Sequence, residues 1–392
     1  MKLFQNAKLI LENSVLEDAF LIEQDGKILS FGNMASIPSF PKEIIDCQGL
    51  FLSPGFIDLH THGGGGYDIM DGTAEAIANT ARMHMAHGTT SIMPTTLTSS
   101  DKDLYAVIDA YHEVLQQEAS LPHMLGLHLE GPYFSKKQKG AQPEQYIISP
   151  TPDHFLKILD YAKGSVKRWS LAPELPGASE LIETLVKQDI LVSAAHTDAT
   201  LTQIKESFTQ GLSLLTHLYS SMSSITRVKG HRVLGVVEAG YLIDDLYVEL
   251  IADGIHLPPE LLRMILRFKD HDKICLCTDS MRAAGMPEGT YLLGAKKEGY
   301  EVLVESGIAV LHDRTAFAGS VATANRCIRI MVQEVGLSLA SAVKMISLNP
   351  ARLIKKESEI GSIAIGKQAD LVMFDSDFTV KSVYVSGKKM LG

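Results

Sequence analysis

The sequence predicts an α/β fold, a (β/α)8 TIM-like barrel with a small β-sandwich built from the N- and C-terminal segments. Short apolar strand patterns alternate with helical patterns through the middle of the chain, which is typical of parallel α/β structures. Both ends show only strand patterns, and 392 residues exceed the usual size of one hydrophobic core. We therefore expect residues 1–53 with 361–392 to form the small domain and residues 54–360 the barrel.

The terminal segments alternate apolar and polar residues and are punctuated by turn residues such as Asp25-Gly26 and Ser386-Gly387. Because two β-rich ends flank a different middle, we expect them to meet in one domain. The strand patterns cover residues 7–11, 19–23, 27–31, 371–374 and 380–385.

The middle of the chain contains eight apolar strand patterns separated by amphipathic helices, including helices expected at residues 73–87, 101–118 and 259–269. In a barrel of this kind the chemistry lies at the C-terminal ends of the strands. The expected strands are residues 55–62, 89–95, 125–130, 168–173, 191–196, 213–217, 247–252 and 273–278.

Composition excludes several classes of partner. A net charge of -10 opposes non-specific binding of nucleic acid, which needs a basic face. No apolar run approaches the roughly 18 residues of a membrane span, and no signal-peptide pattern opens the chain. The four cysteines lie in apolar stretches without disulfide-like spacing. We expect a cytoplasmic protein that acts on a small molecule, with neither a nucleic acid nor a membrane as its partner.

His60 and His62 form a His-x-His pair at the end of the first barrel strand, followed by four glycines. Alternate residues of a strand point to the same face, so both imidazoles would project together. Two neutral imidazoles aimed at one point are half of a metal site, although the same pair also fits an ordinary polar strand end.

Potential ligands also end five of the other expected strands, and the C-terminal ends of barrel strands meet at one mouth. A single strand-end histidine, or one Glu-Gly-Pro, is an ordinary polar terminus or turn. Six such coincidences at the same structural position predict a metal-containing active site. The additional motifs are His128-Leu129-Glu130-Gly131-Pro132, Ala195-His196-Thr197-Asp198, Thr216-His217-Leu218-Tyr219, Asp253-Gly254-Ile255-His256 and Thr278-Asp279-Ser280.

These motifs resemble those of the metal-dependent amidohydrolase superfamily, and within it the N-acetylglucosamine-6-phosphate deacetylases. The similarity runs along essentially the whole chain, from Pro54-Gly55-Phe56-Ile57-Asp58-Leu59 to Phe317-Ala318-Gly319-Ser320 and Asn349-Pro350-Ala351. Many binuclear relatives bridge their metals with a carbamylated lysine that ends the fourth strand. This chain has no lysine at that strand end, so the resemblance assigns the bridge to Glu130.

The resemblance implies one or two divalent ions per subunit. The donors are imidazole and carboxylate without thiolate, which suits Zn²⁺ or Fe²⁺ and does not choose between them. One ion would be held by Glu130, His196 and His217, and a second by His60, His62 and Asp279 with Glu130 as the bridge.

Asp279 is the expected general base, which would take a proton from water and pass it to the departing amine. A purely structural ligand is the alternative for this residue. The resemblance implies that His256 faces the substrate and polarises its carbonyl or holds a sugar hydroxyl. The alternative is that His256 is a capped histidine of the loop with only a structural role. Gln142 lies in a segment resembling a substrate loop, at a position where some relatives carry histidine.

Phosphate recognition is where the chain departs from the family pattern. Ser220 and Ser221 follow the sixth strand where these deacetylases usually carry an Asn-Ala segment. Arg227 and Arg232 are both eligible to bind the phosphate, because planar guanidinium groups suit it. In the family this basic loop often reaches a neighbouring subunit, which implies a homodimer. A solvated surface loop is the alternative explanation of the same residues.

The predicted activity is metal-dependent hydrolysis of the N-acetyl amide of an amino-sugar phosphate, namely N-acetylglucosamine 6-phosphate to glucosamine 6-phosphate and acetate. The altered loop leaves N-acetylgalactosamine 6-phosphate, an unphosphorylated N-acetyl sugar or another N-acyl compound as alternatives. A non-catalytic scaffold is the alternative from another class, and the complete set of expected ligands argues against it.

Overall fold

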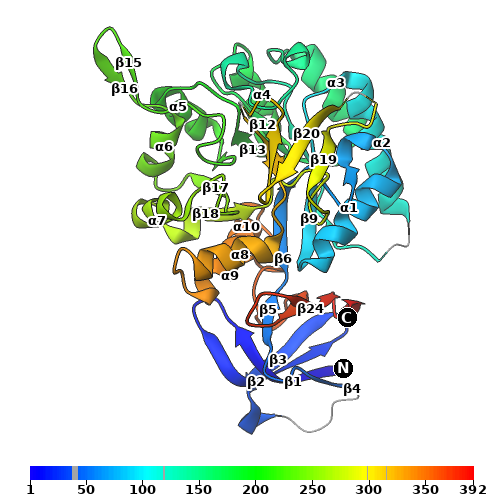
Figure 1. Cartoon of the computed structure of the whole chain (residues 1–392). Coiled ribbons are helices and arrows are strands. Elements are labelled where there is room, and N and C mark those ends of the chain that lie inside the picture. Colours follow the sequence, from blue (N-terminus) through cyan, green and yellow to red (C-terminus); the bar gives the residue numbers. More distant parts are fainter. Residues whose placement is uncertain (38–42, 118–119, 298, 315) are drawn as a thin grey trace.

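The computed structural model of the chain consists of a barrel and a smaller β domain that contains both termini (Figure 1). It describes residues 1–37, 43–117, 120–297, 299–314 and 316–392. The prediction that the two ends of the chain build one small domain around a different middle is confirmed.

The small domain is one eight-stranded sheet in the order β25-β24-β23-β5-β1-β2-β3, with β4 paired to β1. The first and last parts of the chain meet where β5 and β23 pair antiparallel. Its own apolar core includes Phe4 and Tyr384, whose rings meet edge to face at 4.9 Å. The strands are β1 (Lys2–Ile10), β2 (Val15–Gln24), β3 (Lys27–Asn33), β4 (Glu43–Asp46), β5 (Phe51–Pro54), β23 (Leu371–Phe374), β24 (Val380–Val385) and β25 (Lys388–Leu391).

The predicted barrel is also confirmed. Its strands pair parallel in the order β6-β9-β11-β12-β13-β14-β17-β18. The ring closes beyond β18, where the Asp279 N–H donates to the His60 carbonyl at 2.9 Å and Thr61 bridges to Ser280. The strands are β6 (Phe56–Thr61), β9 (Thr89–Thr96), β11 (Leu127–Glu130), β12 (Val166–Leu171), β13 (Leu191–Ala194), β14 (Leu214–Leu215), β17 (Tyr247–Ile251) and β18 (Ile274–Cys277).

Helices cover the outside of the barrel (Figure 1). The three expected helices are present, although α2 ends at Gln116 and residue 118 of the expected range lies outside the described residues. The helices are α1 (Ala74–Ala86), α2 (Asp101–Gln116), α3 (Pro152–Ala162), α4 (Ala178–Lys187), α5 (Leu201–Gln210), α6 (Val236–Leu242), α7 (Pro259–Phe268), α8 (Ala324–Gln333), α9 (Leu339–Ile346) and α10 (Leu348–Leu353).

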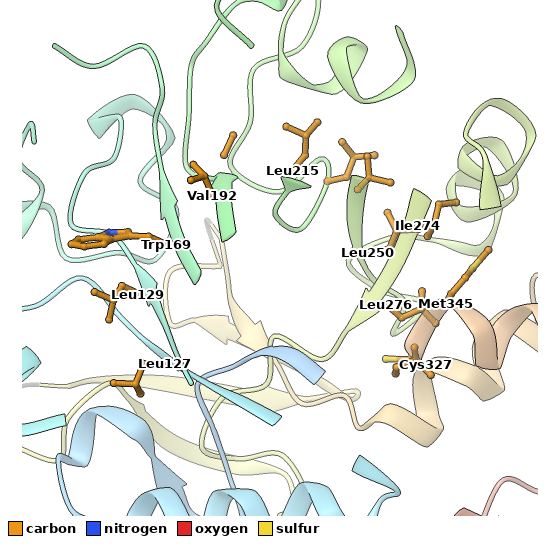
Figure 2. Close-up of a cluster of buried hydrophobic side chains, with 14 of the residues drawn as sticks. Leu127, Leu129, Trp169, Val192, Leu215, Leu250, Ile274, Leu276, Cys327 and Met345 are labelled. Atoms are coloured by element: carbon orange, nitrogen blue, oxygen red, sulfur yellow. The ribbon is translucent and has the colours of Figure 1, made fainter. Parts of the chain in front are cut away.

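Strand alternation separates the apolar side chains that face the helices from the ligand-type side chains that face the inside of the barrel. Figure 2 shows the apolar layer between strands and helices, formed by side chains such as Leu129, Trp169, Leu250 and Leu276. Residues next to them in sequence point the other way, as Glu130 next to Leu129 does. The period of two therefore places ligand-type side chains inside the barrel, because apolar ones fill its contact with the helices.

Two antiparallel elements interrupt the barrel and were not predicted. After β18 comes a four-stranded sheet made of β19 (Gly289–Leu293), β20 (Tyr300–Glu305), β21 (Ile308–Leu311) and β22 (Phe317–Ser320), which packs around Val302 and Val304. A hairpin of β15 (Thr226–Val228) and β16 (His231–Val233) projects from the body of the protein after the sixth barrel strand (Figure 1). Among the described residues, no helix is long and apolar enough to cross a bilayer.

Candidate metal centre and its cavity

The structure brings all six predicted metal ligands together at the C-terminal mouth of the barrel. Each sits at, or within two residues of, the end of a strand, as the sequence predicted. The ligands and their strands are His60 and His62 (β6), Glu130 (β11), His196 (β13), His217 (β14) and Asp279 (β18).

Glu130 lies at the centre of the cluster, and its two carboxylate oxygens face four imidazoles. Oε1 is 3.1 Å from Nε2 of His217 and 3.6 Å from Nε2 of His196. The same oxygen is 3.4 Å from His60 Nε2, while Oε2 is 3.3 Å from His62 Nε2. This carboxylate therefore touches both predicted ligand groups, which is the position that a bridging ligand needs.

The second group joins the His-x-His pair to Asp279. The Nε2 atoms of His60 and His62 are 3.2 Å apart, and Asp279 Oδ1 lies 3.3 Å and 3.2 Å from them. In this group, and in that of Glu130, His196 and His217, all ligand atoms lie within 4.8 Å of one another.

The donor set fits a divalent cation. Nδ1 of His60 faces a carboxylate oxygen of Glu249 at 3.1 Å, and a carboxylate can only accept, so the lone pair of a neutral His60 is on Nε2. That lone pair points at the imidazole of His62 and at two carboxylates, an arrangement that a shared cation would stabilise. Imidazole nitrogen and carboxylate oxygen without thiolate match the donors of Zn²⁺ and Fe²⁺ sites.

Three of the ligands occupy the left-handed backbone region, which residues other than glycine rarely adopt. His196, His217 and Asp279 have φ angles of 47°, 33° and 45°. Such a conformation costs on the order of 1–3 kcal/mol and persists only where the surroundings impose it. Here it turns each strand end so that the side chain enters the mouth of the barrel.

Electrostatics keep the carboxylates of the centre ionised. Burial alone would raise the pKa of Glu130, but the imidazoles around it hold that pKa well below its ordinary value. The pKa of Asp279 is likewise lowered by His60 and His62 against the effect of burial. Burial opposes a charge on His62, yet Asp279 and Glu130 raise its pKa to about 10. The centre therefore attracts positive charge.

Beneath the centre lies a buried ion pair between Arg168 of β12 and Glu249 of β17. The Arg168 Nη1 and Nη2 atoms donate to the two Glu249 oxygens at 2.7 Å and 2.8 Å. Although burial favours a neutral carboxyl, Arg168 holds the pKa of Glu249 well below its ordinary value. The sequence did not identify this pair.

A cavity of about 240 Å³ opens above the cluster. Four of the predicted substrate-binding residues line it, namely Gln142, Ser220, Ser221 and His256. Leu293 and Phe317 of the unpredicted four-stranded sheet form part of its wall.

Gln142 and His256 are both held in fixed orientations. The Gln142 amide donates to Glu130 Oε2 at 2.7 Å, and its carbonyl accepts from the Thr98 N–H at 2.9 Å. Nδ1 of His256 faces Asp253 Oδ2 at 2.8 Å, so its other ring nitrogen is free for the cavity. Sequence reasoning missed the supporting role of Thr98, because nothing local links it to Gln142. It also missed that of Asp253, although Asp253 lies only three residues before His256 in the same motif.

Arg227 and Arg232 lie elsewhere. They pair across the β15–β16 hairpin and are exposed. In the described part of the chain, neither is among the residues that line the cavity. Their role as phosphate ligands stays a prediction, and it requires the hairpin to reach a site outside its own subunit.

Comparison with known proteins gives this arrangement a family. The sequence model of the amidohydrolase family matches residues 51–390, which include every predicted ligand. The chain belongs to the amidohydrolase family. The predicted resemblance is therefore confirmed, and this amidohydrolase is a hydrolase that acts on an amide.

Curated relatives narrow the comparison further. The amidohydrolase is 35% identical over 381 residues to the N-acetylglucosamine-6-phosphate deacetylase of Bacillus subtilis (strain 168), covering 96% of this chain and 94% of the relative. It is also 32% identical over 384 residues to the N-acetylgalactosamine-6-phosphate deacetylase of Escherichia coli O157:H7, covering 97% of each.

Among solved structures, N-acetylglucosamine-6-phosphate deacetylase from Pasteurella multocida superposes with a TM-score of 0.90 at 31% identity, over 100% of this chain and 99% of that one. The deacetylase mutant from Mycobacterium smegmatis, in complex with N-acetyl-D-glucosamine-6-phosphate, superposes with the same TM-score at 28% identity over the same shares. The fold and connectivity of the deacetylases are therefore present along the full length of this chain.

Proposed function

We propose that this amidohydrolase removes the acetyl group of N-acetylglucosamine 6-phosphate and releases glucosamine 6-phosphate and acetate. The proposal rests on one observation: Glu130 contacts two groups of candidate metal ligands at the floor of a cavity. Gln142 and His256 also line that cavity, and hydrogen bonds to Glu130 and Asp253 fix the orientation of their polar atoms. The names of the relatives supply the class of substrate.

The proposed cofactor is one or two divalent ions, with Zn²⁺ and Fe²⁺ as the preferred candidates from the donor set. Glu130, His196 and His217 would hold one ion, and His60, His62 and Asp279 the other. When bound, such an ion lowers the pKa of water and polarises the amide carbonyl. The presence of the complete His-x-His pair favours two ions.

Asp279 is the proposed general base. Its carboxylate borders the cavity, and its low pKa keeps it ionised, so it can accept the proton of the attacking water. It then returns that proton to the sugar nitrogen as the C–N bond breaks, because the amine leaves more readily when protonated. His256 would hold the acetyl carbonyl or a sugar hydroxyl, and Gln142 would keep Glu130 in place.

The phosphate contact and the oligomeric state form one further proposal. The β15–β16 hairpin presents Arg227, Lys229, His231 and Arg232 on an exposed projection. In a homodimer such a projection could supply the phosphate ligands of the partner's cavity, with Ser220 and Ser221 contributing from within the subunit. The cytoplasm stays the proposed location.

The galacto epimer is the second candidate substrate. A relative named N-acetylgalactosamine-6-phosphate deacetylase is 32% identical over 97% of the chain, close to the 35% of the relative named N-acetylglucosamine-6-phosphate deacetylase. The two sugars differ only in the orientation of one hydroxyl, so the contacts of that hydroxyl with the cavity wall would decide between them.

Acetate release from a panel of sugars tests the proposal. The panel contains N-acetylglucosamine 6-phosphate, its galactosamine epimer and both unphosphorylated sugars, each supplied with Zn²⁺ or Fe²⁺. We expect the first compound to give the highest kcat/KM. A higher kcat/KM for the galactosamine epimer would make that epimer the preferred substrate. If the enzyme turns over neither of the phosphorylated sugars, the proposal is refuted.

A further inference from the structure

A buried hydrogen-bond network connects one metal-ligand group to the interior of the barrel. His60 Nδ1 lies 3.1 Å from Glu249 Oε2, and Glu249 is gripped at both oxygens by Arg168. His60 and Arg168 are fully buried, and Glu249 is 1% exposed. Water therefore does not compete for these contacts.

The Arg168 guanidinium uses every donor that it has. Its five N–H groups are matched by five acceptors on β6, β13 and β17 and at the residue after β14, so the side chain has no free rotation. The Nη atoms donate to both Glu249 oxygens, the Leu59 carbonyl and Thr216 Oγ1, and Nε donates to Ser193 Oγ. This network fixes where the Glu249 carboxylate stands.

His60 is the only one of the four imidazole ligands whose Nδ1 faces a charged group in the described part of the chain. His196 Nδ1 faces the Gln138 carbonyl at 2.9 Å, whereas His62 Nδ1 and His217 Nδ1 are buried there without a hydrogen-bond partner. A carboxylate that accepts from Nδ1–H forces the lone pair onto Nε2 and orients the ring.

We propose that Glu249, held by Arg168, is a positioning residue that fixes His60 as an Nε2 ligand and thereby controls occupancy of the metal position formed by His60, His62 and Asp279. This inference rests on the two-ion form of the proposed function. Glu249 is not itself a ligand in this assignment, because Arg168 and His60 already take its oxygens. Its contribution is to the second ion, while the group of Glu130, His196 and His217 does not depend on it.

The test removes both charges together, because either alone would leave an unpaired buried charge. In Arg168→Met/Glu249→Leu, metal content and Zn²⁺ affinity are measured by competition with a chromophoric chelator. We expect the second ion to bind about 10- to 100-fold more weakly and the first to be unchanged. Arg168→Met/Glu249→Gln should recover part of the loss, because the amide oxygen can still accept from His60 Nδ1.

Ser193→Ala is the matched control, since it removes one Arg168 partner and leaves Glu249 and His60 untouched. It should keep both ions. Two ions of unchanged affinity in the Met/Leu variant would overturn the inference. A wild-type chain that binds only one ion would instead refute the two-ion form of the proposed function.

A measurement on the wild type covers the case in which the double variant does not fold. In the Zn²⁺-loaded protein, ¹⁵N-labelled histidine should show a slowly exchanging imidazole N–H signal for His60 Nδ1, absent in His60→Asn. Rapid exchange of that proton with water would contradict a buried hydrogen bond to Glu249 and overturn the inference.

Discussion

Replacing Asp279 by asparagine separates its chemical role from its structural one. The backbone at this position is held by two hydrogen bonds, from its N–H to the His60 carbonyl at 2.9 Å and from the Ser320 N–H to its carbonyl at 3.0 Å. Asparagine has the same shape, so we expect it to occupy the same place. What disappears is the negative charge 3.2–3.3 Å from the imidazoles of His60 and His62, together with the ability to take a proton.

The expected loss in kcat follows from the role assigned to this carboxylate. A positioned general base contributes about 10²- to 10⁴-fold, which corresponds to about 3–5 kcal/mol in the activation barrier. The assay is acetate release from N-acetylglucosamine 6-phosphate at saturating substrate, with metal content measured on the same sample. The ion at Glu130, His196 and His217 should remain, because Asp279 is not part of that group.

Asp198→Asn is a suitable control for Asp279→Asn. Asp198 follows the fifth barrel strand at the same rim but contacts Lys137 and Gln138 rather than the metal centre. Its replacement should change kcat by less than about threefold. A fully active Asp279→Asn enzyme would refute the assignment of Asp279 as the base.

Three further predictions concern the support of the centre, its acid sensitivity and its phosphate contact. Gln142→Leu leaves the Thr98 N–H without its partner, at about 1–3 kcal/mol, and removes one hydrogen bond from Glu130 Oε2. The urea midpoint and kcat/KM should therefore both fall, and unchanged values would contradict the role of the amide. Burial lowers the pKa of His84 from 6.5 to about 4. Between these two pH values the unfolded chain binds a proton at His84 that the folded chain does not bind. The free energy of unfolding should therefore fall by about 3 kcal/mol as the pH drops from 6.5 to 4. In His84→Gln, urea titrations should show a smaller fall of the unfolding free energy between pH 6.5 and 4. An unchanged fall would refute the role of His84. Alanine at both hairpin arginines should raise KM at least tenfold for phosphorylated sugars only, and an unchanged KM would exclude them as phosphate ligands.

The barrel, and the meeting of the six candidate ligands at its mouth, could be predicted because both depend on local patterns. Each strand is a short apolar run, and each ligand lies at the end of one, so the geometry of a parallel barrel brings the ligands together without further information. The convergence of His60 and Asp279, more than two hundred residues apart, follows from this rule alone.

The supporting contacts could not be predicted, because they depend on pairs of residues that no local pattern connects. Arg168 and Glu249 are 81 residues apart. Glu249 is the one charged residue of its strand, whereas Arg168 follows Lys167 in an otherwise uncharged strand. A buried charge of this kind needs a partner of opposite charge, so the presence of a charge in each of two buried strands was the signal that the sequence offered for this ion pair. Similarly, Gln142 was expected to contact substrate, and its hydrogen bond to Glu130 depends on the path of the intervening loop.

The four-stranded sheet after β18 was missed for a different reason. Its strands alternate apolar and polar residues around turns such as Ser306-Gly307, a pattern that local analysis can detect. A (β/α)8 barrel does not require such a sheet, so the predicted fold class gave no reason to expect it. Leu293 and Phe317 of this sheet line the cavity, so the predicted substrate-binding residues did not include this part of its wall.

Titration of metal-free enzyme with Zn²⁺, followed by acetate release from N-acetylglucosamine 6-phosphate, tests the account most directly. The two ligand groups that meet at Glu130 predict an inactive chelated enzyme whose activity rises with added metal and saturates at two equivalents per chain. Saturation at one equivalent would contradict the two-ion centre. Full activity after chelation, or no acetate release at any metal concentration, would contradict the account as a whole.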